Sequence, residues 1–218
     1  MIRKPEIAIW GAGRIILVLM LYSVAPAAWC DKQTQGRFLL AAPGLADPNF
    51  AETVVLLVRH DADGALGLIV NRPTGVRAEE VLPQLETFSA YQAPVFFGGP
   101  VMVDRMMVLM RSDEAPAEAE LVADDVYVSA SSTVLANLPA DHVRPERVRI
   151  YAGHAGWGPG QLDHEIAAGG WHLVPARMDM LFEAPDGPDW RRLLPDSRLL
   201  SAEAFGPSGQ TLPAYVRR

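Results

Sequence analysis

The chain has 218 residues, of which 50% are hydrophobic and 21% are charged, so it can bury a substantial core and lacks the composition of a disordered protein. The 26 acidic residues outnumber the 19 basic ones, for a net charge of -7. The basic residues form no run longer than a pair, such as Arg217 and Arg218 at the end of the chain, which disfavours direct nucleic-acid binding, because phosphate neutralisation needs a concentrated basic patch. The single cysteine, Cys30, excludes an internal disulfide and a cysteine-based zinc site.

The first residues differ in character from the rest of the chain. Basic residues up to Arg14 precede an apolar run at 15–22, and a small-x-small pattern ends at Ala27. We predict a signal peptide or N-terminal anchor at 1–27, followed by a linker at 28–35. A genuine signal implies an exported or periplasmic protein; the alternative is a misplaced start codon and a cytoplasmic protein. The apolar run is short for a stable membrane span, and no other span is predicted.

Apolar runs bounded by Gly, Pro and Asx residues predict the strands. The expected strands are 38–42, 53–59, 65–71, 94–97, 106–111, 126–130, 148–152 and 171–175. Residues 60–64 should join the second and third of these strands in an antiparallel hairpin. Short helices are expected at 78–86, 132–138 and 161–168, and helical turns at 178–182 and 189–194.

These elements predict one α+β domain over 36–194, with a mixed sheet and short helices. No repeat or internal linker divides it. The strand-helix-strand passages at 126–152 and 148–175 suggest some parallel pairing. Residues 112–120 are acidic and rich in alanine, so we expect an exposed loop there, and 195–218 should form a loose tail.

The stretch 153–165 carries four glycines within its first eight residues and leads into the predicted helix at 161–168. Backbone amides at such a turn can hold a phosphate or carboxylate. However, the spacing matches neither a P-loop nor a dinucleotide-binding fingerprint, and Pro159 removes one amide. The competing interpretation is a tight strand-to-helix turn against which Trp157 packs.

Other candidate groups are isolated in the sequence. Arg72 follows a buried strand and precedes a proline, where it could grip a carboxylate or phosphate or form a structural ion pair. His154 could meet Asp163 or His164 across the turn as a base or metal ligand. The five histidines are scattered and no HExxH or GxSxG motif occurs, so no catalytic residue, metal site or cofactor is predicted.

Several motifs together resemble the bacterial AlgH/YqgE family. They comprise GRFLLA at 36–41, DPNF at 47–50, GALGLIVNRP at 64–73, FGGPV at 97–101 and AGWGPGQL at 155–162. The resemblance covers nearly all of the predicted domain. It implies a compact α+β fold with a bulged, largely antiparallel sheet.

Members of that family are mostly small cytosolic proteins of undefined biochemistry. One is linked to transcriptional control of alginate production in Pseudomonas, and no catalytic residues are agreed for the family. The export-like segment and His154 depart from the usual family pattern. The export-like segment conflicts with a role in transcription, because an exported protein cannot act on DNA directly.

The favoured hypothesis is a non-enzymatic binding or regulatory protein that holds a small anion or an unknown protein partner. The expected ligand-binding residues are Asn71, Arg72, Gly98, Gly99, Gly156, Trp157, Gly158, Gly160 and Gln161. The first alternative is a hydrolase that uses His154 and Asp163. The second is a transcriptional regulator in the cytosol, which the acidic charge disfavours.

Overall fold

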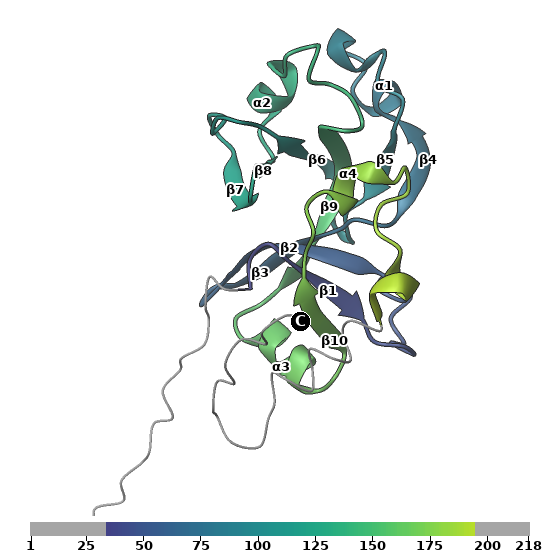
Figure 1. Ribbon diagram of the computed structural model, residues 1–218, viewed down its shortest axis with the longest axis vertical. Coiled ribbons are helices and arrows are strands. Elements are labelled where there is room, and N and C mark those ends of the chain that lie inside the picture. The colour runs from purple at the N-terminus through teal and green to yellow at the C-terminus, as the bar shows by residue number, and fades with distance from the viewer. Residues whose placement is uncertain (1–33, 195–218) are drawn as a thin grey trace, which may run out of the picture.

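The computed structural model describes residues 34–194. Within that range ten strands share one sheet of main order β10-β1-β2-β3-β9-β6-β8-β7, with β5 beside β9 and β4 beside β5 (Figure 1). The strands are β1 (Arg37–Ala41), β2 (Val54–Asp61), β3 (Gly64–Ile69), β4 (Pro73–Arg77), β5 (Pro94–Phe97), β6 (Val101–Arg111), β7 (Glu120–Ala123), β8 (Val126–Ser129), β9 (Val148–Trp157) and β10 (Trp171–Pro175).

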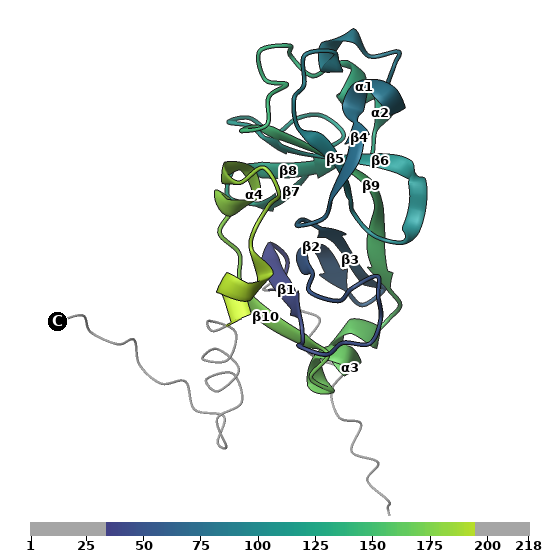
Figure 2. The same ribbon diagram turned by 90° about the vertical axis from the view of Figure 1, so that its right-hand side faces the viewer.

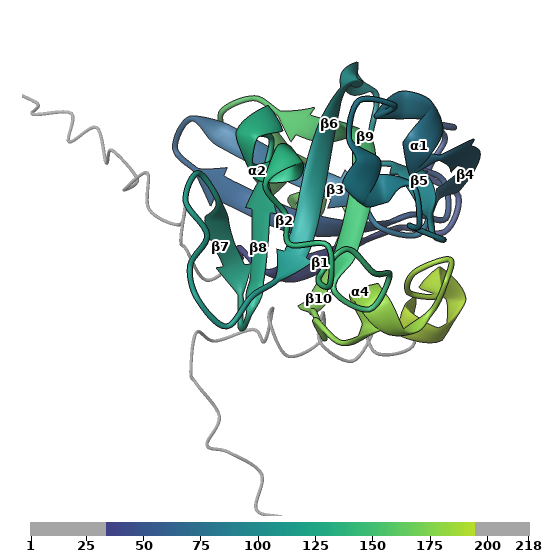
Figure 3. The ribbon, with the colours of Figure 1, turned by 90° about the horizontal axis from the view of Figure 1, so that it is seen from above.

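Strand β9 connects two groups of strands, which we call the first half-sheet (β1, β2, β3 and β10) and the second half-sheet (β4 to β8). Its N-terminal part pairs antiparallel with β6 and parallel with β5. Its C-terminal part, from Ala155 to Trp157, pairs antiparallel with β3. Figure 2 shows β9 running from one group to the other, and the two groups cross when seen from above (Figure 3).

Five short helices have bounds within the described residues: α1 (Ala78–Val81), the 3-10 helix η1 (Glu86–Phe88), α2 (Ser132–Ala136), α3 (Gln161–Ala167) and α4 (Met180–Glu183). Residues 190–194 are also helical, close to the predicted turn at 189–194. Helices α1, η1 and α2 pack on the second half-sheet and α3 packs on the first, whereas α4 packs on the cluster that both half-sheets share. Ser131 caps α2, because its hydroxyl accepts hydrogen bonds from the amides of Thr133 and Val134. None of the helices within 34–194 is long and apolar enough to cross a lipid bilayer.

The alternation of side chains along the strands divides the core into three clusters. One contains side chains of both half-sheets and of α4, including Leu56, Leu109 and Phe182. A second lies between the second half-sheet and the two segments that carry α1 and α2. The third packs α3 on the first half-sheet around Leu57 and Leu162. Burial on both faces explains why the strands read as continuous apolar runs.

The structure confirms the single α+β domain with a bulged, largely antiparallel sheet. The suggested parallel pairing is wrong in its location, because 126–129 and 171–175 both lie apart from β9 in the strand order. The one parallel ladder among the described strands joins β5 to β9. The predicted segments 1–27 and 195–218 lie outside the described residues, as does the linker up to residue 33.

Several element boundaries also differ from expectation. Strand β9 continues through the glycines to Trp157, and β6 starts at Val101, five residues earlier than predicted. The helix expected at 78–86 ends at Val81, two residues before Pro83, which cannot donate the next helical hydrogen bond. Strands β4 and β7 were not predicted.

Candidate functional site

The glycine-rich turn is shorter than expected and is closed by its own side chains. Its exposed residues 158–160 separate β9 from α3. The amide of Gly158 donates to Oε1 of Gln161 at 3.0 Å, and the amide of Gln161 donates to the Gly158 carbonyl at 3.0 Å. Gly160 is the N-cap residue, with a φ of 67° that favours glycine. Both of these amides are thus engaged inside the chain.

Glu165 ties this turn to the first half-sheet. Its Oε2 accepts hydrogen bonds from Nε1 of Trp157 at 2.9 Å and from Nε1 of Trp171 at 2.8 Å. Its Oε1 accepts from Nε2 of Gln161 at 2.8 Å. The two indoles stack edge to face, with 5.8 Å between ring centroids, and Phe50 contacts both. Trp157 and Gln161, expected at a ligand site, therefore hold α3 on the sheet.

Gly98 and Gly99 connect β5 to β6 and lie against the backbone of β9. The amide of Gly98 donates to the Ala152 carbonyl at 2.9 Å, and its carbonyl accepts from the Ile69 amide at 2.8 Å. A Cβ on Gly98 would lie 2.3 Å from the Gly153 carbonyl oxygen, and one on Gly99 would lie 2.2 Å from the backbone of His154. At these positions another part of the same chain, rather than a ligand, approaches the main chain.

Asn71 and Arg72 anchor the loop that precedes β2. Asn71 accepts a hydrogen bond from the amide of Val54 at 2.8 Å and donates one to the Glu52 carbonyl at 3.0 Å. Arg72 donates to the carbonyls of Pro48, Asn49 and Ala51. Burial lowers the pKa of Arg72, and the charge of Asp47 opposes that shift. The guanidinium thus acts as a backbone clamp.

Asn71 also lines a hollow of about 390 Å³. The carboxylate-bearing residues Glu52, Asp186 and Asp189 share that lining, while Arg191 supplies its basic group. Three carboxylates against one guanidinium disfavour a bound anion there. The residues expected to form one ligand site thus divide among the turn, the strand crossing and this clamp.

In the structure Asp163, one member of the proposed hydrolase pair, contacts a different histidine. Asp163 Oδ1 lies 3.3 Å from Nε2 of His60, a buried histidine at the end of β2. His154 is half-buried on β9 opposite Val101. Burial lowers the pKa of His154, and the nearby charge of Arg105 lowers it further. No group of three or more His, Cys, Asp or Glu residues within 34–194 is placed to hold a metal ion.

A cavity of about 370 Å³ lies under the 112–119 segment, a region expected to be only an exposed loop. We call it the β6–β7 cavity. Its lining residues come from the end of β6, from the 112–119 segment, from α2 and from the chain that leads into β9. The lining is mainly apolar and includes Met110, Pro116, Val134, Leu138 and Val148. Its polar residues include Ser112, Asn137 and His142, and its charged residues are Arg111, Glu114 and Glu118.

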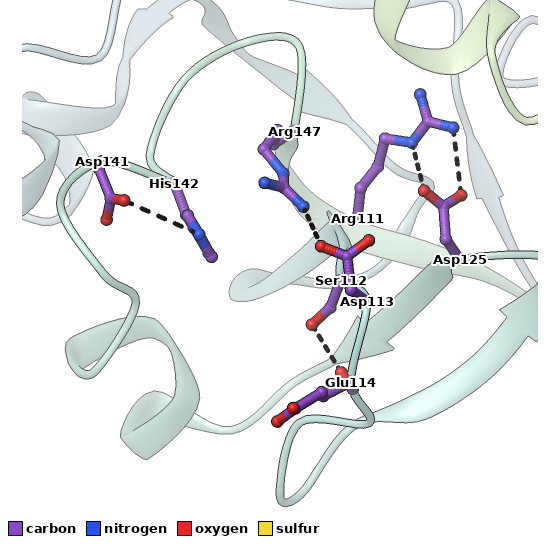
Figure 4. A network of polar contacts seen from close by, with 8 residues as sticks. All are labelled: Arg111, Ser112, Asp113, Glu114, Asp125, Asp141, His142 and Arg147. Carbon is purple, nitrogen blue, oxygen red and sulfur yellow. Dashed lines mark hydrogen bonds and ion pairs between the residues drawn. The ribbon is translucent and has the colours of Figure 1, made fainter.

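Polar contacts shape the walls of this cavity. Figure 4 shows Arg111 paired with Asp125 at 2.9 Å and Arg147 with Asp113 at 3.4 Å. The hydrogen bond from Arg111 to Asp125 raises the pKa of the arginine. Glu118 joins the segment to α2, because its carbonyl accepts from Ser129 and its carboxylate from Ser131. The 112–119 segment is therefore held in place without a ligand.

Sequence reasoning missed the cavity and the His60–Asp163 contact. A cavity under a polar, alanine-rich loop has no sequence signature. The sequence analysis treated His60 as one of five scattered histidines. The available signal for a polar site was its position directly after a predicted strand and before two aspartates, Asp61 and Asp63.

A family model described as AlgH-like matches residues 38–198. A UPF0301 protein of Thioalkalivibrio sulfidiphilus is 39% identical over 175 residues, covering 77% of this chain and 94% of that protein. A UPF0301 protein of Ruegeria pomeroyi is 39% identical over 178 residues, covering 78% of this chain and 96% of that protein.

Two solved structures are also similar to this chain. The solution structure of the AlgH protein from Pseudomonas aeruginosa has 37% identity and a TM-score of 0.60, covering 82% of this chain and 95% of that one. The crystal structure of protein DIP2367 from Corynebacterium diphtheriae has 22% identity and a TM-score of 0.63, covering 78% and 90% respectively. The second likeness supports the fold alone.

Proposed function

The chain belongs to the AlgH-like family, and from this premise we propose that it is a non-enzymatic binding protein whose ligand is a small, partly apolar molecule held in the β6–β7 cavity. The observation that carries the proposal is the cavity itself. Its volume of about 370 Å³ falls in the range of small-molecule sites, roughly 300–1,000 Å³.

The lining indicates what such a ligand needs. Met110, Val134 and Leu138 offer an apolar wall, so a ring or short hydrocarbon would gain from leaving water. The amide nitrogen of Asn137 already donates to the Thr133 carbonyl, so its amide oxygen and the imidazole of His142 are the polar groups offered, and a ligand with one hydrogen-bonding end matches the site. The proposed ligand class is thus an amphipathic molecule with an apolar body and one polar end.

This cavity is a different site from the small-anion site expected from sequence. The groups expected to bind an anion are already hydrogen-bonded within the chain, which favours the cavity. The amides of Gly158 and Gln161 and the guanidinium of Arg72 already have partners within the chain. The proposed hydrolase lacks support because Asp163 contacts His60. A protein partner stays a prediction, and so does the absence of direct nucleic-acid binding.

The test is a fluorescence titration with 8-anilinonaphthalene-1-sulfonate, an amphipathic dye whose emission rises in apolar sites. Ala117 is exposed and lines the cavity, so Ala117→Trp should fill it without disturbing the core. Ala167→Trp is the matched control on α3, where the side chain is also exposed. We expect saturable 1:1 binding to the wild type and to Ala167→Trp, with at least a tenfold weaker affinity for Ala117→Trp. Equal affinities, or no saturable signal from the wild type, would overturn the proposal.

We further propose that the protein is exported, on the strength of the basic and apolar pattern of 1–27. N-terminal sequencing of protein from fractionated cells tests this. A mature start near Ala28 in the envelope fraction supports export. An intact or downstream start in the cytosol supports the cytoplasmic alternative and rejects export.

A further inference from the structure

We infer that Thr34 is a covalent modification site for activated acyl groups, with His60 as its base and Asp163 as the group that orients the base. Oγ1 of Thr34 lies 2.8 Å from Nδ1 of His60, and Nε2 of the same ring lies 3.3 Å from Oδ1 of Asp163. A hydroxyl, an imidazole and a carboxylate in this order form the arrangement that activates a nucleophile in acyl transfer.

A β-bulge in β2 brings His60 into this arrangement. Strict alternation from Leu56 and Val58, which both belong to the cluster shared by the half-sheets, would place residue 60 on that same face. The pairing with β3 shifts between Leu57 and Arg59, so that His60 lies opposite Ala65. Ala65 belongs to the cluster covered by α3, so the bulge turns the imidazole toward the helix that carries Asp163.

Thr34 is held by a tight turn at the start of the domain. The amide of Arg37 donates to the Thr34 carbonyl at 3.2 Å, and the amide of Gly36 donates to the Leu57 carbonyl at 2.8 Å. Gly36 has a φ of 74°, and a Cβ there would lie 2.7 Å from Cβ of Ala123. The turn is therefore packed between β2 and β7, and it places the Thr34 hydroxyl at the ring of His60.

The burial of the three groups suits proton transfer. The His60 side chain is 3% exposed, whereas that of Asp163 is 51% exposed. Nε2 of His60 is the ring nitrogen near the carboxylate, and when the ring carries its proton on Nε2, Nδ1 accepts the hydrogen bond from Thr34. Thr34 itself is half-buried, and the inference requires that an acyl donor reach its hydroxyl from solvent.

The step is an acyl transfer from an activated ester or thioester. Oγ1 of Thr34 attacks the carbonyl carbon, a bond forms between these atoms, and the bond to the leaving alkoxide or thiolate breaks. The hydroxyl proton moves to Nδ1 of His60 and from there to the leaving group. The products are an O-acylated Thr34 and a free alcohol or thiol.

The experiment treats the full chain with p-nitrophenyl acetate and locates the acetyl group by tandem mass spectrometry. We expect one acetyl group on Thr34 and none on Thr53 or Thr74, whose hydroxyls donate to backbone carbonyls. Thr34→Val should abolish the adduct and Thr34→Ser should retain it. His60→Gln should slow labelling about 100-fold or more, because a positioned base contributes roughly 10²–10⁴ in rate.

Three controls separate this inference from a folding defect and from the proposed function. Circular dichroism checks that His60→Gln is folded. Asp163→Asn alters an exposed carboxylate and should slow labelling while leaving stability nearly unchanged. Ala117→Trp, which tests the cavity, should label like the wild type. An unlabelled Thr34 in the wild type, or equal rates in folded His60→Gln and wild type, would refute the inference.

Discussion

Oε2 of Glu165, on α3, lies 2.9 Å from the indole nitrogen of Trp157, the last residue of β9. The same oxygen accepts from Trp171 at the start of β10. One carboxylate thus joins the helix to two strands that are not neighbours in the sheet. This arrangement gives the glycine-rich motif a structural purpose, because the turn must place α3 so that Glu165 reaches both indoles.

Replacing Glu165 with alanine should destabilise the domain by about 2–5 kcal/mol. Both indoles are buried, and each N–H group left without an acceptor costs roughly 1–3 kcal/mol. Urea unfolding followed by tryptophan fluorescence measures the loss. Glu165→Gln keeps one acceptor oxygen and should lose less, and Glu120→Ala, at an exposed site on β7, should change little. A Glu165→Ala midpoint equal to that of Glu120→Ala would contradict the arrangement.

Gly99→Ala should be among the most damaging single changes, with an expected loss of about 3 kcal/mol or more. Its φ is 149°, and the added methyl group would lie 2.4 Å or less from three backbone atoms of His154 and Ala155. Gly75→Ala meets nothing within 4 Å and should be nearly neutral. Thermal unfolding of the two variants makes the comparison. A small loss for Gly99→Ala would show that the strand crossing tolerates expansion.

Arg149→Met should loosen α4 more than the rest of the domain. Arg149 is 1% exposed, and its guanidinium lies 5.2 Å from the Phe96 ring centroid and donates to the carbonyls of Leu181, Phe182 and Ala184. Removing it leaves buried acceptors unpaired, at roughly 1–3 kcal/mol each.

Hydrogen exchange measures the effect of Arg149→Met. We expect a loss of protection over 178–187 that exceeds the loss in β1 or β2. Arg144→Met, at an exposed position, is the control and should leave the pattern unchanged. Uniform loss across the domain would indicate that Arg149 supports the whole core instead of α4.

His154 should make stability fall as the pH drops. Its folded-state pKa is lowered, chiefly by burial and further by Arg105, so the unfolded chain binds the proton more readily. The free energy of unfolding is therefore highest above the unfolded pKa of about 6.5, and it decreases as the pH falls through 6.5 toward the folded value.

Urea unfolding at a series of pH values measures this dependence. His154→Gln should flatten it relative to the wild type. Arg105→Gln should raise the pKa of His154, which NMR of the imidazole protons reports directly. The same pH slope in His154→Gln and wild type would exclude His154 as its source.

Local sequence pattern was sufficient for much of the sheet. Strand β10 occupies the predicted residues 171–175, and β3 differs from its prediction by two residues at most, because β-branched and apolar runs bounded by turn residues mark buried strands. The short, largely exposed β4 and β7 lack that pattern and were missed. The pairing of strands depends on contacts between distant parts of the chain, and no local pattern encodes those contacts. The sequence analysis therefore misplaced the parallel ladder, which joins β5 to β9.

The candidate site was harder to predict for a related reason. A glycine in the sequence indicates that another group can approach the backbone closely, but it does not identify that group. For Gly98 and Gly99 the neighbouring group is the backbone of β9. The bulge that redirects His60 inserts one residue into a regular run and leaves no mark in composition. The sequence therefore suggested His154, nine residues before Asp163, as its partner, whereas the contact is made with His60 at the end of β2.

The pairing of β1 with β10 sets an order of events during synthesis. Strand β1 (Arg37–Ala41) pairs with β10 (Trp171–Pro175), and the paired residues are 130 or more positions apart in the sequence. This ladder can therefore form only after β10 has been synthesised. Strand β9 likewise must emerge before the half-sheets can join. Because such non-local pairing is slow to form, the edge of β1 that pairs with β10 stays unpaired until residues 171–175 have been made.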